Sequence, residues 1–160
     1  MWTDTMKTLI TPAEVVALAF GTSNSIRAQQ VSEATIVAAQ RKYLLPVLGS
    51  TLLDDLLYGF YGEEVIEPLK MALALYVKRL MLPALAAQVG MAGVVRYVGE
   101  GYTDVDAVTF GRLLTRTKAD ADAVLDAVVD IMETNPDLYP SYDAAENVRH
   151  RINIASKVIL

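Results

Sequence analysis

The chain contains no cysteine and a single histidine, and both shortages restrict its chemistry. Without thiols there is no disulfide, thiolate metal site or cysteine nucleophile, which fits a reducing cytoplasm. The histidine, His150, stands between Arg149 and Arg151, whose positive charge would repel a metal cation. A plain surface histidine is therefore the simpler interpretation than a metal ligand or a catalytic base.

The sequence also lacks the motifs of common active sites. It has no Gly-rich phosphate loop, no zinc-ligand spacing and no hydrolase motif. Its paired acids, Asp54-Asp55 and Glu63-Glu64, are neighbours in sequence, so on a helix they point in different directions and form no convergent pair. Helix caps and solvated faces explain them more simply. We expect no catalytic residue, no cofactor and no metal, and hence a protein that is not an enzyme.

The sequence also lacks an excess of basic residues and an apolar run long enough to span a membrane. A net charge of −5 argues against a general nucleic-acid binder. Residues 1–10 contain no apolar run of signal-peptide length, so secretion is not expected. The most apolar window, residues 71–95, is interrupted by Lys78, Arg79 and Pro83, which favours a buried helix over a membrane span. With 160 residues, 53% of them hydrophobic, we expect one domain with a real core.

Helical periodicity dominates the chain. Thr11-Pro12-Ala13-Glu14 predicts a capped helix start, with Thr11 as the cap and Glu14 completing a capping box. We predict a mainly α fold: a single-domain helical bundle around a long central helix, with a small β-hairpin or flap and an extended C-terminal tail. Residues 1–148 would form the helical domain and residues 149–160 the tail. The expected helices cover residues 11–20, 34–45, 52–58, 69–89 and 106–134.

A sharp corner between the second and third helices is the most specific local feature. Pro46 should end the helix that carries Tyr43, because proline disfavours the α conformation of the residue before it. Gly49, after Leu48, supplies the freedom to turn. Ser50 or Thr51 would cap the next helix, with Asp54 in the capping-box position if Thr51 is the cap. The structural corner is thus Tyr43, Pro46, Leu48 and Gly49.

Two segments are candidate interaction elements. Residues 94–105 have strand character around Gly99-Glu100-Gly101, and a flap that orders on contact with a neighbour is one interpretation and a simple surface hairpin the other. In the tail, apolar residues alternate with polar ones as on a strand with one apolar side, which predicts docking on another subunit or protein. Folding back over the chain's own helices is the alternative. The candidate interaction residues are Arg96, Tyr97, Tyr102, Arg149, Arg151, Ile152, Ile154, Val158 and Leu160.

The last long helix carries an acidic stripe, Asp122, Asp126, Asp130 and Glu133, away from its apolar face. A solvated helix face is the plain interpretation. The alternative is that these acids face the lumen of a ring, where negative charge would keep passing DNA from sticking. In the docking case, Arg149 and Arg151 would meet this stripe on a neighbouring copy.

The segment Ala39-Gln40-Arg41-Lys42-Tyr43-Leu44-Leu45-Pro46-Val47-Leu48-Gly49 resembles a helix ending of the form A-x-x-K-Y-[IL]-x-P-[ILV]-L-G. Together with the order of helices and hairpin over residues 8–142, it is similar to the small head-tail connector (adaptor) proteins of tailed bacteriophages, of the Bacteroides phage and prophage type. The tail after Ala144 lies outside the similarity.

This resemblance implies a structural virion protein without catalytic residues. Such adaptors form a ring, often dodecameric, between the portal and the tail. The implied partners are other copies of the chain, the portal and the tail-side virion proteins, with DNA only as passing cargo and no membrane. The implied location is the virion, and the bacterial host cytoplasm during assembly. The alternative function is a small helical regulatory or enzyme-accessory module, whose pattern of helices would look much the same.

Overall fold

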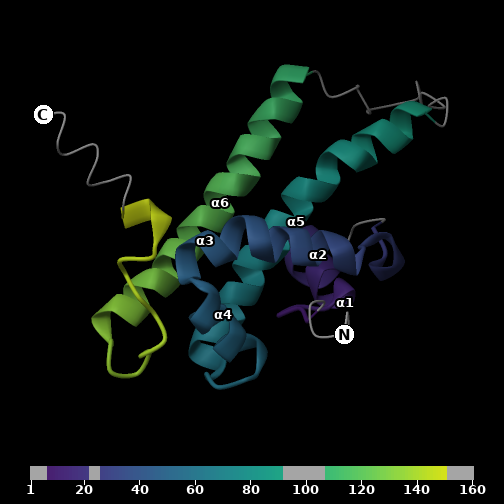
Figure 1. The fold of residues 1–160 in the computed structure, drawn as a ribbon. Coiled ribbons are helices and arrows are strands. Elements are labelled where there is room, and N and C mark those ends of the chain that lie inside the picture. The colour runs from purple at the N-terminus through teal and green to yellow at the C-terminus, as the bar shows by residue number, and fades with distance from the viewer. Residues whose placement is uncertain (1–6, 22–25, 92–106, 151–160) are drawn as a thin grey trace, which may run out of the picture.

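The structure, a computed structural model, describes residues 7–21, 26–91 and 107–150. Within these ranges the regular structure is helical and contains no strand, so the prediction of a mainly α fold is confirmed (Figure 1). The hairpin predicted over residues 94–105 lies outside the described residues. So do the candidate residues Arg96, Tyr97, Tyr102, Arg151, Ile152, Ile154, Val158 and Leu160.

The first helix, α1 (Pro12–Val15), begins as the sequence predicts. The Glu14 N–H donates to Thr11 Oγ1 at 3.3 Å, and the Thr11 N–H donates back to Glu14 Oε2 at 2.8 Å, which completes the capping box. The helix continues as the π-helical turn η2 (Val16–Phe20). The short 3₁₀ turn η3 (Ala28–Gln30) then leads to α2 (Glu33–Ala39), which Ser32 caps: its Oγ accepts a hydrogen bond from the Ala34 N–H.

The prediction that Pro46 ends the second helix is wrong. After α2 the chain forms the π-helical turn η4 (Gln40–Leu44) and then α3 (Leu45–Leu48), so the helix passes through Pro46. In η4 the Leu45 N–H donates to the Gln40 carbonyl, five residues back. This wider turn displaces the carbonyls that the proline ring would meet in a regular helix, and Pro46 sits in the first turn of α3, where its missing N–H costs little.

The turn itself is made at Gly49, which has φ 80° and ψ 160°. This positive φ agrees with the prediction that Gly49 supplies the freedom to turn, and α4 (Ser50–Leu57) starts immediately after it. No side chain caps α4, so the predicted cap at Ser50 or Thr51 and the capping box with Asp54 are wrong. Gly49 occupies the cap position instead, because its backbone already turns the chain into the helix.

Two long helices follow, α5 (Glu63–Met91) and α6 (Ala107–Thr134). They pack against each other, and α5 also contacts α1, α2, η2 and η4. Figure 1 shows that the two helices diverge toward the ends that residues 92–106 join. The expected start of the last helix at Asp106 lies outside the described residues, and α6 is helical from the first described residue, Ala107.

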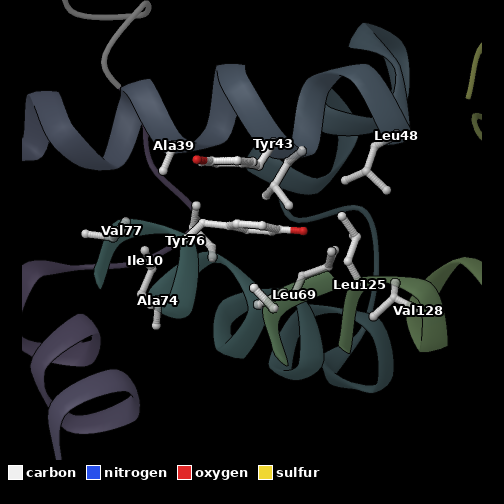
Figure 2. Packing of buried hydrophobic residues seen from close by; sticks show 14 of the residues in the cluster. Ile10, Ala39, Tyr43, Leu48, Leu69, Ala74, Tyr76, Val77, Leu125 and Val128 are labelled. Carbon is white, nitrogen blue, oxygen red and sulfur yellow. The ribbon is translucent and has the colours of Figure 1, made fainter. Parts of the chain in front are cut away.

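The core lies where α5 meets α2, η4 and α6 (Figure 2). Tyr76 of α5 is fully buried, and its ring stacks on that of Tyr43 with 4.2 Å between ring centroids and 6° between ring planes. The apolar face predicted for the last helix is buried in its second half and only half-buried at Phe110 and Leu114. The buried members of this face are Ala121, Leu125, Val128 and Met132.

Candidate interaction surfaces

The corner residues belong to the interior of the fold. Tyr43 and Leu48 are buried, and Pro46 and Gly49 are half-buried. Arg79 of α5 donates from Nη1 to the Tyr43 hydroxyl at 3.1 Å and from Nε to the Leu114 carbonyl of α6 at 3.2 Å. Tyr43 is thereby tied to both long helices, through its stacked ring and through Arg79. These contacts give the corner a packing role.

The C-terminal described segment lies on the acidic side of α6. Arg149 donates from Nη2 to Asp122 Oδ1 at 2.8 Å and to the Tyr76 hydroxyl at 3.2 Å. Its Nη1 donates to Asp126. The sequence predicted that Arg149 would meet an acidic stripe but assigned that stripe to a neighbouring copy. The structure places Arg149 on the stripe of its own chain, because residues 135–148 turn back along α6.

The acid at the centre of this contact is Asp122. Partial burial would raise its pKa, but hydrogen bonds from Lys118 Nζ at 2.6 Å and from the Tyr76 hydroxyl at 2.5 Å, with the charge of Arg149, lower it below its usual range. Burial, reinforced by the hydrogen bond to Asp122, raises the pKa of Tyr76 well above that of a free tyrosine. Tyr76 therefore acts as a donor to Asp122 from inside the core.

A second set of contacts lies one helical turn or more further along α6. His150 Nε2 lies 2.5 Å from Glu133 Oε1, and the Tyr142 hydroxyl donates to the same oxygen at 2.8 Å. Asn147 is buried, donates to the Tyr142 hydroxyl at 3.0 Å and accepts from the Arg149 N–H at 3.0 Å. Burial is the main cause that raises the pKa of Tyr142 to about 12.

These contacts divide the acidic stripe. Asp122, Asp126 and Glu133 are engaged by Arg149 and His150, although the side chain of Asp126 remains 59% exposed. Asp130 is exposed on the helix surface and joins none of these contacts. An open groove of about 550 Å³ runs between the stripe and the returning chain. Whether Asp126 and Asp130 face a lumen remains a prediction.

Sequence reasoning missed a cluster of aromatic and apolar side chains at the C-terminal end of α4. The loops 58–62 and 135–142 lie side by side there, since the Tyr61 and Tyr139 ring centroids are 5.4 Å apart and the Tyr61 hydroxyl donates to Ser141 Oγ at 3.1 Å. The same loops expose Tyr58, Phe60 and Leu138, at 59%, 72% and 64%. From the sequence, the run Gly59-Phe60-Tyr61-Gly62 predicts only a break after the preceding helix, although its aromatic content is the signal that could have indicated this cluster.

A third feature is the extended segment before α1. The side chain of Gln40, 3% exposed, accepts from the Leu9 N–H at 2.7 Å and donates to the Lys7 carbonyl at 3.1 Å. Beside it runs a groove of about 380 Å³, lined by Thr8, Leu9, Leu56, Leu57, Gly59, Tyr61, Gly62, Glu63, Ile66, Glu67 and Lys70. Nothing in the periodicity of the sequence indicated this use of a glutamine.

The described part of the chain contains no group of three or more His, Asp or Glu side chains placed to hold a metal ion. None of its helices combines the length and apolarity that crossing a membrane requires.

Residues 26–152 match the model of a family of unknown function, DUF6712. The chain belongs to this family. No curated protein and no solved structure matches the chain. The matched region of DUF6712 starts before α2, includes the corner and both long helices, and passes through Arg149 and His150. It therefore crosses the boundary that the sequence predicted between residues 148 and 149.

Proposed function

We propose that this DUF6712 protein is a structural virion component, a head-tail connector whose copies form a ring between portal and tail. The proposal starts from the resemblance of residues 39–49 to the adaptor corner. In the fold these residues form η4, α3 and the turn at Gly49, with Tyr43 stacked in the core. A motif that shapes the interior is what an architectural protein requires.

The observation that carries self-assembly is the uncovered first half of α6. Val108 is 64% exposed and Leu113 is 39% exposed, while the second half of the helix is buried along its apolar face. The first half lies where α5 and α6 diverge (Figure 1). Large apolar side chains left exposed on such a helix favour contact with another protein. In a ring, a neighbouring copy would cover them.

The charge distribution supports the same proposal. Asp130 is exposed, Asp126 is exposed but paired with Arg149, and the chain carries a net charge of −5. A ring that presents such acids to its channel would repel the phosphates of passing DNA and let the genome move. The partners would be other copies of the chain, the portal and the tail-side proteins, in the virion and in the host cytoplasm during assembly.

The test is light scattering and negative-stain electron microscopy of the purified chain over a wide concentration range, alone and mixed with a phage portal protein. We expect closed rings with a central channel. Val108→Asp should shift the population to monomers without loss of helical circular dichroism. Ala127→Asp, which adds the same charge at an exposed position on the packed half of α6, should leave the rings intact.

Monomers at every concentration, with no binding to the portal, would contradict the connector proposal. The small helical regulatory or accessory module would then be the better description of the chain.

A further inference from the structure

The backbone before α1 is paired on one side at Lys7 and Leu9, and the described contacts leave the opposite side open at Thr8. The Gln40 side chain donates a hydrogen bond to the Lys7 carbonyl and accepts one from the Leu9 N–H. In an extended chain these two backbone groups point to the same side. The N–H and carbonyl of Thr8 must then point to the opposite side. Among the described residues Thr8 makes no hydrogen bond, although it is only half-exposed. This is the chemistry of a free strand edge.

The free edge borders the groove of about 380 Å³ that Thr8 helps to line. Its floor includes Leu56, Leu57 and Ile66, which are buried or half-buried. Its rim carries Glu63 and Glu67, both exposed. The Lys70 ammonium at the rim is held by Glu14 at 2.8 Å and lies 3.9 Å from Glu67, so it offsets the charge of the rim acids only in part. The groove thus offers backbone pairing, an apolar floor and negative charge.

We propose that this groove receives residues 151–160 of a second copy, which add to the Thr8 edge as a strand. The inference rests on the self-assembly in the proposed function. Ile152 and Ile154 alternate with polar residues, so one side of such a strand is apolar and suits the floor. Arg151 and Lys157 carry the positive charge that complements the acidic rim.

The position where the described chain stops favours a second copy. His150 contacts Glu133 of α6. Figure 1 shows this part of the chain and the segment before α1 on opposite sides of α4. To reach the Thr8 edge of its own copy, the segment after His150 would have to pass around α4. The same segment of a neighbouring copy in a ring does not have this constraint.

Cross-linking tests the contact directly, because the chain has no cysteine of its own. Full-length Thr8→Cys and Ile154→Cys chains are mixed under mild oxidation, and we expect a disulfide-linked dimer of the two. Ala127→Cys mixed with Ile154→Cys is the control and should give only background. A Thr8→Cys/Ile154→Cys double variant should form linked chains of several copies. An internally closed monomer as the main product would overturn the proposal.

Backbone pairing is tested by a substitution that removes the free N–H. Thr8→Pro should weaken binding of a labelled peptide of residues 149–160 to the full chain by roughly tenfold or more, whereas Thr8→Val should change it by less than about twofold. A peptide carrying Ile154→Asp should bind more weakly to the unaltered chain than one carrying Asn153→Asp, which lies on the other side of the strand. These peptide variants leave the folding of the chain untouched.

Equal binding by the Thr8→Pro and Thr8→Val chains, both folded by circular dichroism, would overturn the strand pairing. So would binding seen only after residues 1–6 are deleted, since the groove would then be filled by the chain's own N-terminus. Closed rings without the cross-link would reject this inference and leave the connector proposal standing. The cross-link without closed rings would support the inference and reject the ring.

Discussion

At the scale of single residues, Gly49 is a position where the backbone conformation restricts which amino acids fit. Its φ of 80° and ψ of 160° lie in a region that side chains with a Cβ rarely adopt. A Cβ built there would meet Glu146 Oε2 at 2.7 Å, but that atom is the end of an exposed side chain that can move. Strain in the backbone is therefore the main cost of a substitution.

We predict that Gly49→Val lowers the melting temperature by roughly 3–10 °C, from a strain on the order of 1–3 kcal/mol in a chain of this size. Thermal unfolding followed by circular dichroism measures it. Gly59→Val provides the comparison, because Gly59 has the same φ of 80° with no atom within 4 Å of its Cβ. Similar losses would assign the effect to backbone strain, and an unchanged Gly49→Val would contradict the turn.

Asp122 makes the stability of the fold depend on pH in the acidic range. Its pKa is lowered in the folded state, so the unfolded chain binds a proton at a higher pH than the folded chain does. The stabilisation is fully present above the unfolded carboxyl range, roughly pH 4, and is lost as the pH falls through the lower folded pKa. Glu14, whose pKa the hydrogen bond from Lys70 lowers, contributes with the same sign.

We predict that the free energy of unfolding falls between about pH 5 and pH 2, and that Asp122→Asn makes the fall shallower. Urea unfolding at a series of pH values measures the slope. Asp130→Asn is the matched control on the same helix, because within the described part of the chain its carboxylate joins no ion pair. An equal effect of both substitutions would show that general acid denaturation, and not the Arg149 contact, sets the slope.

Periodicity revealed the acidic stripe but not which chain would neutralise it. The stripe follows from helical spacing of charged residues, and that depends on sequence alone. The contact of Arg149 with Asp122 and Tyr76 depends on how residues 135–148 return along α6, which is set by tertiary packing. Gln40 was missed for the same reason, since pairing with Lys7 and Leu9 joins segments more than thirty residues apart.

At the scale of elements, local rules succeeded where a single turn decides the outcome. The capping box at Thr11, the cap at Ser32 and the course of α6 follow from side chains within a few residues. The rule that proline ends a helix failed at Pro46, because the π-helical turn η4 relieves the clash that the rule assumes. A wider turn leaves no distinct pattern of apolar residues, so it could not be predicted from the sequence.

We predict that Pro46→Ala changes the melting temperature by less than about 3 °C, and far less than Gly49→Val does. Alanine restores an N–H and suits a helix better, while the unfolded chain gains freedom, and these effects of about 1 kcal/mol oppose each other. Thermal unfolding of both variants in one buffer gives the comparison. A large loss at Pro46 would mean that proline, and not Gly49, shapes the corner.

At the scale of the whole molecule, the structure moves the boundary between the folded domain and the tail. Arg149 and His150 contact Asp122, Asp126 and Glu133, so they belong with the helical domain. A cut after Val148 would remove those contacts together with residues 151–160. It would then confuse a loss of folding with a loss of docking.

Two cuts separate the effects. A chain of residues 1–150 keeps every contact of Arg149 and His150, so we expect it to melt within about 2 °C of the full-length chain. A chain of residues 1–148 leaves Asp122 without its guanidinium partner, and we expect the melting temperature to fall by roughly 3–8 °C, since hydrogen bonds to charged groups contribute about 1.5–3 kcal/mol.

Assembly of the two shortened chains is measured by light scattering at matched concentrations. If residues 151–160 bind a neighbour, the 1–150 chain should remain monomeric although it is fully folded. If it assembles as the full-length chain does, docking through the tail is rejected, and the uncovered first half of α6 is left to account for any ring.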